Sequence, residues 1–134
     1  MASTPKTGPT DVSVDAFLSA IDDPRRRSDA HAVAAMMAEI TGESAVLWGS
    51  SIVGFGNDGG SKGGWPLISF SPRKANLVLY VANDFPERAQ LIPRLGKVKT
   101  GVGCLYVSRL EDVDQAVLHD LCGRAVRAVK AGSD

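Results

Sequence analysis

The stretch that decides the fold of this chain runs from residue 45 to residue 81 and reads AVLWGSSIVGFGNDGGSKGGWPLISFSPRKANLVLYV. It contains four short segments rich in Val, Ile, Leu and aromatic residues, with Gly, Asn, Ser and Pro between them, which is typical of consecutive strands. The segments are AVLWG (45–49), SIVGF (51–55), WPLISF (65–70) and NLVLYV (76–81). The gaps are too short for helices, so neighbouring strands are expected to pair mainly antiparallel.

Two helices are predicted ahead of these strands. Ser13 precedes the segment VDAFLSAI, whose apolar residues recur at helical spacing, so Ser13 is expected to cap a short helix. Asp23 and Pro24 suit the cap and the first position of a second helix, which Gly42 is expected to end. The core-facing stripe of that second helix is expected to be Ala30, Val33, Ala34, Met37 and Ile40.

The C-terminal third alternates between helix and strand. A helix is predicted from Asp84 to Leu95, with Pro93 disturbing its last turn, and GKVKTGVG (96–103) is expected to be a loop. CLYVSRL (104–110) follows as a strand, and the last helix is expected over 113–129, opened by Asp112 and closed by Gly132. The resulting order is α-α-β-β-β-β-α-β-α, which indicates an α+β fold with a mostly antiparallel sheet of about five strands and helices packed on it.

Composition and charge limit the possible partners. The 134 residues carry fifteen basic and fifteen acidic side chains, which gives no electrostatic reason to expect nucleic acid or an anionic membrane as a partner. Residues 1–12 have no periodicity and are expected to be a disordered tail, and residues 13–134 a single domain. No signal peptide and no apolar run of about 18 residues is found, so a cytoplasmic location is expected. Cys104 and Cys122 are accordingly expected to be free thiols in the core.

Several chemical motifs fail in their context. Residues 54–59, GFGNDG, match the dinucleotide-binding pattern, but a further strand follows where that motif needs a helix. Gly96 and Lys97 lack the rest of a P-loop, and no GxSxG elbow is present. His31 and His119 are distant from each other and from both cysteines, so zinc spacing is absent as well. The lack of a nucleophile, base or metal motif favours binding over catalysis.

One polar constellation stands above this background. Ser71-Pro72-Arg73-Lys74 follows a predicted strand, and Gly96 to Gly101 carries Lys97, Lys99 and Thr100. If the sheet brings these two segments together, their cations and hydroxyls would form a basic cleft for a small anionic ligand, a carboxylate or phosphate. Trp48 and Trp65 flank the glycine-rich connection and would be the walls of this cleft. The alternative is that the cations are solvated turn residues and the tryptophans are core residues.

The order of DDPRR (22–26), ITGE (40–43), LWGSSIVGFG (47–56), GGWPLISFSPRKANLVLY (63–80) and LGKVKTGVGCLYVSRLEDVD (95–114) closely resembles the bacterial YdhG-like family, domain of unknown function 1801. The resemblance runs from about residue 14 to residue 129 and implies a compact α/β sandwich. The positions that match the family pattern are Trp48, Gly49, Gly54, Phe55, Gly56, Trp65, Ser71, Arg73, Lys74, Lys97, Lys99 and Cys104. Relatives often have a longer, tyrosine-containing connection where residues 57–64 are short here.

Some members of that family are regarded as frataxin-like iron chaperones. The resemblance therefore implies an alternative function, in which surface carboxylates bind iron weakly and deliver it to an iron-accepting protein. Oxygen ligands suit this hard cation. The candidate ligands lie on and around the opening helices: Asp15, Asp22, Asp23, Asp29, Glu39 and Glu43. Two further alternatives are a protein-interaction module that uses a sheet edge or the glycine-rich connection, and an enzyme with an unrecognised site.

Overall fold

The structure of the chain is a computed structural model that describes residues 13–49, 51–56, 66–73, 76–81, 85–101 and 103–132. The described helices are α1 (Val14–Ser19), α2 (Pro24–Thr41), α3 (Arg88–Leu95) and α4 (Gln115–Gly132), and a short 3₁₀ helix, η2 (Leu110–Asp112), precedes α4. The described strands are β1 (Ala45–Trp48), β2 (Ile52–Phe55), β3 (Ile68–Pro72), β4 (Leu77–Tyr80), β5 (Lys99–Gly101) and β6 (Cys104–Val107). The predicted tail, residues 1–12, lies outside the described residues.

The strands form one antiparallel sheet in the order β1-β2-β3-β4-β6-β5. The first four strands are neighbours in both sequence and space, as expected for strands joined by short connections. After β4 the chain passes through α3 and β5 before β6 returns to pair with β4. This order leaves β1 at one edge of the sheet and β5 at the other.

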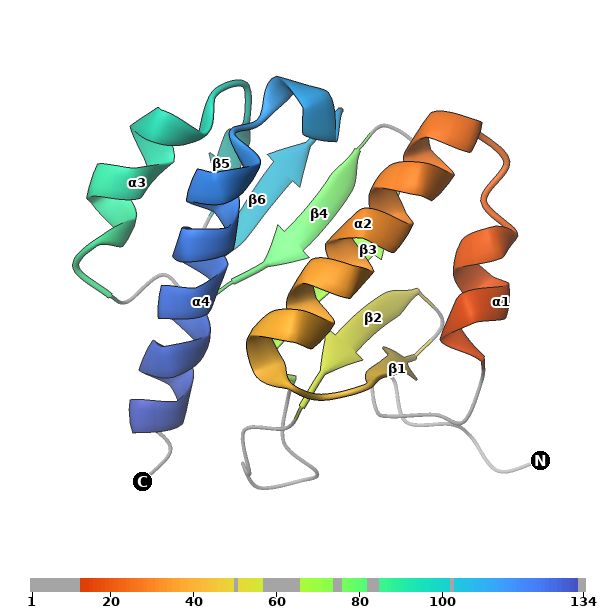
Figure 1. Cartoon of the computed structure of the whole chain (residues 1–134), viewed down its shortest axis with the longest axis horizontal. Coiled ribbons are helices and arrows are strands. Elements are labelled where there is room, and N and C mark those ends of the chain that lie inside the picture. Colours follow the sequence, from red (N-terminus) through yellow and green to blue (C-terminus); the bar gives the residue numbers. More distant parts are fainter. Residues whose placement is uncertain are drawn as a thin grey trace.

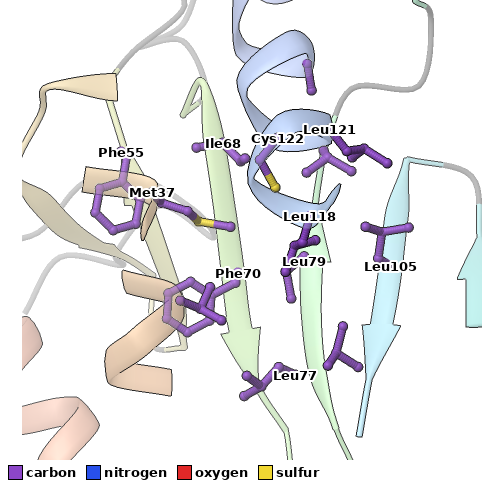
Figure 2. Packing of buried hydrophobic residues seen from close by; sticks show 14 of the residues in the cluster. Met37, Phe55, Ile68, Phe70, Leu77, Leu79, Leu105, Leu118, Leu121 and Cys122 are labelled. Carbon is purple, nitrogen blue, oxygen red and sulfur yellow. The ribbon is translucent and has the colours of Figure 1, made fainter. Parts of the chain in front are cut away.

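The helices pack on one face of the sheet, which we call the helix face. In Figure 1, α2 and α4 pass in front of the sheet, with α1 near β1 and α3 near β5. Alternate strand residues point to this face because side chains alternate along a strand. Figure 2 shows Phe70, Leu79 and Leu105 on three neighbouring strands beneath Met37 of α2 and Leu118 of α4, and all five are at least 99% buried. They belong to one apolar cluster with residues from α1, α2, α3 and α4 and from β1, β2, β3, β4 and β6.

The capping signals at the two opening helices are confirmed. The Ser13 hydroxyl accepts a hydrogen bond from Ala16 N at 3.1 Å, and the Asp23 carboxylate accepts one from Arg25 N at 3.0 Å. Gly42 ends α2 with a φ of 71°, a left-handed conformation that glycine adopts without strain. Cys104 and Cys122 are buried free thiols, also as expected.

Three details of the predicted order need correction. The sheet has six described strands because Lys99–Gly101, expected to be part of a loop, pairs with β6. The last helix begins at Gln115, where the Asp114 carboxylate accepts a hydrogen bond from Val117 N, while Asp112 ends the 3₁₀ turn. The helix predicted from Asp84 begins at Arg88 instead, and it ends at Leu95 as expected, with Pro93 inside it. None of the described helices is long and apolar enough to cross a membrane.

Candidate functional site

A cavity of about 520 Å³ lies where the β3–β4 turn, the α3–β5 connection and the end of β6 meet. We call it the lysine cavity, since two of its lining side chains are Lys97 and Lys99. The described residues that line it are Asn76, Lys97, Val98, Lys99, Tyr106, Ser108 and Asp112. These residues come from segments up to 36 positions apart, between Asn76 and Asp112, so the tertiary fold brings them together.

The register between β5 and β6 places Lys99 and Tyr106 beside each other in this cavity. Lys99 of β5 is the cross-strand partner of Tyr106 of β6, so their side chains leave the sheet on the same face. Tyr106 is in turn the partner of Val78 in β4. This face lies opposite the helix face, because Leu79 and Leu105 of the apolar core alternate with Val78 and Tyr106.

The position of Lys97 in the cavity depends on a close approach between the end of α3 and η2. Lys97 N donates a hydrogen bond to Asp112 O at 3.2 Å, and Asp114 N donates one to Leu95 O at 2.7 Å. Gly96 lies between them with a φ of 106°, and a Cβ at this position would lie 2.6 Å from Asp112 O. A side chain would therefore push η2 away, so glycine is what allows Lys97 to sit beside Asp112.

The charges in the cavity suit an anion bound near one carboxylate. Lys97 and Lys99 are exposed, and neither forms an ion pair with a carboxylate within the described part of the chain. Asn76, Tyr106 and Ser108 add neutral hydrogen-bond donors. Asp112 is the acidic side chain among the described lining residues and repels an anion, so it favours a ligand that also carries a hydrogen-bond donor.

A polar network adjoins the cavity on the same face of the sheet. Arg73, just after β3, donates hydrogen bonds from Nη2 to the Tyr80 hydroxyl at 3.2 Å and from Nε to Ser71 Oγ at 3.3 Å. The Tyr106 hydroxyl and Cys104 Sγ are hydrogen-bonded at 3.2 Å. This bond with Cys104 raises the pKa of Tyr106, and the charge of an ionised Cys104 raises it further. Tyr106 is thus a neutral phenol at physiological pH.

The structure brings together only part of the predicted basic cleft. Lys97 and Lys99 line one cavity, and the exposed Arg73 lies on the same face two strands away from β6. Thr100 pairs with Leu105, so its side chain leaves β5 on the face opposite to Lys99. Trp48 is in β1, at the other edge of the sheet from β5, and is therefore no wall of this cavity. Lys74 and Trp65 lie outside the described residues.

Trp48 instead packs over the neighbouring strand. A Cβ on Gly54 would lie 2.7 Å from Trp48 Cδ1 and 2.7 Å from Pro66 Cγ, so the indole covers the glycine. Trp48 is only 3% exposed. This packing corresponds to the core alternative for Trp48, in which the ring fills space above β2.

The acidic residues implied as iron ligands are spread over the helices. Asp23 caps α2, Asp29 Oδ2 accepts a hydrogen bond from Leu110 N at 3.2 Å, and Glu39 Oε1 lies 3.2 Å from His119 Nε2. Asp15 is in the first turn of α1, and Asp22 and Glu43 are exposed. Within the described ranges, no three or more His, Cys, Asp or Glu side chains gather in a way that could hold a metal ion.

Four lining residues had no distinguishing signal in the sequence. Asn76, Ser108 and Asp112 are ordinary turn residues, and Tyr106 is one aromatic in a predicted strand. Tyr106 could have been predicted as a lining residue from its pairing with Lys99, but β5 has no alternation of apolar residues that would reveal this pairing in the sequence.

No family's sequence model matches this chain, and no curated protein or solved structure matches it either. The resemblance to the YdhG-like family therefore stays a prediction from the sequence.

Proposed function

We infer that this protein is a non-enzymatic binding domain that takes a small anionic ligand in the lysine cavity. The observation that carries this inference is the shared lining of one cavity by three neutral hydrogen-bond donors and by two lysines that form no ion pair with any carboxylate among the described residues. Ammonium groups attract an anion, while hydroxyl and amide groups orient its oxygen atoms. Lys97 N is hydrogen-bonded to Asp112 O, and Lys99 of β5 pairs with Tyr106 of β6, so the backbone that carries both lysines does not need a large rearrangement for binding.

The test is a titration of isotope-labelled protein with inorganic phosphate, followed by backbone amide signals. We expect the amide signals of residues 97–99 and 106–108 to shift with a common dissociation constant. The double substitution Lys97→Ala and Lys99→Ala removes both ammonium groups and is expected to weaken binding at least tenfold, since charged hydrogen bonds contribute about 1.5–3 kcal/mol each.

The matched control removes the same charge elsewhere. Arg94 and Arg127 are exposed and do not line the cavity, so the double substitution Arg94→Ala and Arg127→Ala should leave phosphate affinity nearly unchanged. Asp112→Asn keeps the backbone oxygen that holds Lys97 and removes a like charge, so it should strengthen binding. Equal affinities in the wild type and the lysine variant would contradict the inference.

Iron binding is the other function predicted from the sequence, and the same labelled protein tests it. An anaerobic titration with ferrous iron, with magnesium as the control, would broaden signals of α1 and α2 if their carboxylates held the metal. Broadening there, together with no response to phosphate, would favour the iron chaperone over the proposed anion-binding function.

A further inference from the structure

Three flat side chains continue the lysine cavity across the face of the sheet opposite the helices. They are Arg73, Tyr80 and Tyr106, and we call them the stacking surface. Tyr106 belongs to both regions because it also lines the cavity. Both tyrosines are half-buried and Arg73 is exposed, so none of the three is a core residue.

The strand register places the two phenol rings diagonally on adjacent strands. Tyr106 is the partner of Val78, and Tyr80 is the partner of Cys104, so the two tyrosines are offset by two residues on these antiparallel strands. Diagonal neighbours of this kind are roughly 7–8 Å apart, which is within contact range for aromatic rings. The Arg73 guanidinium reaches the Tyr80 hydroxyl at 3.2 Å and extends the surface by one strand.

Buried and hydrogen-bonded neighbours hold these side chains in place. Beneath Arg73 lies Ser71, which is 0% exposed and accepts its Nε hydrogen bond. A Cβ on Gly101 would lie 3.3 Å from Tyr106 Cε2, so the Tyr106 ring rests against the backbone of β5. The hydrogen bond between Tyr106 and Cys104 orients the ring further. The surface is therefore formed before a ligand arrives.

The chemistry of the two adjoining regions is complementary. Phenol rings and a guanidinium plane stack with an aromatic ring, and such stacking contributes strongly to nucleobase binding. Two ammonium groups and three neutral donors match the several acceptor oxygens of a phosphate better than the two of a carboxylate. The neutral Tyr106 lies between the regions and does not repel a phosphate.

We propose that the ligand is a small molecule in which an aromatic ring is linked to a phosphate, as in a nucleoside monophosphate. The phosphate lies between Lys97 and Lys99, and the ring stacks on Tyr106 and Tyr80. This inference rests on the proposed anion-binding function and adds the class of ligand. Tyr106 lies one strand from Lys99 and Tyr80 lies two strands from it, and neighbouring strands are about 5 Å apart. A single nucleotide spans this separation without any glycine-rich phosphate loop.

Three probes separate the two contributions in calorimetric or amide-shift titrations. They are adenosine monophosphate, ribose 5-phosphate, which lacks the ring, and adenosine, which lacks the phosphate. We expect adenosine monophosphate to bind at least about tenfold more tightly than ribose 5-phosphate, since stacking of one base supplies a factor of this size. Adenosine is expected to bind most weakly.

Variants of Tyr80 show whether the ring uses the stacking surface. Tyr80→Leu removes the aromatic face without touching the cavity lining, so it should weaken adenosine monophosphate binding about tenfold and leave ribose 5-phosphate binding the same. Tyr80→Phe keeps the ring and should retain the tighter binding. Circular dichroism and the thermal unfolding midpoint check that each variant folds.

The outcomes distinguish this inference from the function on which it rests. Equal affinity for adenosine monophosphate and ribose 5-phosphate, with both lost in the double lysine variant, would overturn the stacking inference and leave the anion cavity intact. Tight binding of adenosine monophosphate that Tyr80→Leu does not change would overturn it too. No binding of either phosphate would overturn both the ligand class and the proposed function.

Discussion

At the scale of single residues, Cys122 couples stability to pH. Its side chain points from α4 into the apolar cluster and is 0% exposed (Figure 2). Burial disfavours the thiolate and raises the pKa of Cys122 to about 12. An unfolded chain ionises this thiol at a pKa near 8.5, so the unfolded state loses a proton at lower pH than the folded state.

The stabilisation that comes from the raised pKa of Cys122 is fully present below about pH 8.5. The free energy of unfolding should therefore fall as the pH rises above that value. We expect a loss of about 1–2 kcal/mol between pH 8 and pH 10 in urea denaturation experiments. Cys122→Ala lowers stability at every pH by leaving a small cavity, but it should remove this part of the pH dependence. An equally steep decline in the alanine variant would contradict the assignment to Cys122.

The sequence also predicts the residues that cap the two opening helices. Ser13, Asp23 and Gly42 act through contacts within four residues of themselves, so the sequence contains all the partners of each interaction. The predicted start of α4 is wrong because Asp112 and Asp114 both suit a helix cap. Only the pairing of residues 112–114 with residues 95–97 distinguishes these two positions. That pairing is a tertiary interaction and leaves no local pattern.

At the scale of elements, the connection from α3 to β5 determines whether the lysine cavity exists. Gly96→Ala introduces a Cβ 2.6 Å from Asp112 O at a φ of 106°, so both the contact and the backbone conformation are unfavourable. We expect the variant to lose about 1–3 kcal/mol of stability and to bind phosphate more weakly, because η2 and Lys97 must separate.

Gly42→Ala is the matched control for this prediction. Gly42 also has a positive φ, 71°, but a Cβ there would have no heavy atom within 4 Å. It should cost about 1 kcal/mol through backbone strain alone and leave phosphate affinity unchanged. Equal losses of stability and affinity in the two variants, measured by urea denaturation and phosphate titration, would contradict a special role for the Gly96 contact.

The elements also show why the candidate site was only partly predictable. The sequence indicates that Lys97 and Lys99 form a basic segment. Their common cavity depends on β5, which is short and exposed and therefore has no strand pattern in the sequence. The role expected for Trp48 failed because sequence proximity to the glycine-rich connection says nothing about the distance between β1 and β5 across the sheet. Strand order is a property of the assembled sheet.

At the scale of the whole molecule, one long-range contact joins the helical layer to the cavity end of the sheet. The Asp29 carboxylate in α2 accepts a hydrogen bond from Leu110 N of η2 at 3.2 Å, across 81 positions of sequence. Asp29→Ala leaves this part-buried N–H without its acceptor and should lower the free energy of unfolding by about 1–3 kcal/mol.

Asp29→Asn provides the corresponding test of mechanism, since the amide oxygen can still accept the hydrogen bond and most of the stability should return. Asp22→Ala removes an exposed carboxylate between α1 and α2 and should change stability by less than about 0.5 kcal/mol. Urea denaturation of the three variants makes the comparison. Equal effects of the Asp29→Ala and Asp22→Ala substitutions would show that the contact with Leu110 contributes little.

The strand order has a consequence for how quickly the chain reaches its native state. The pairings from β1 to β4 connect strands that are adjacent in sequence, whereas Tyr80 meets Cys104 only after α3 and β5 have been brought around. Closing that longer loop costs entropy before the new contacts compensate for it. We therefore expect the β4–β6 pairing to form more slowly than the pairings from β1 to β4, and because β6 carries Tyr106 and leads to Ser108, the first four strands alone do not hold the lysine cavity.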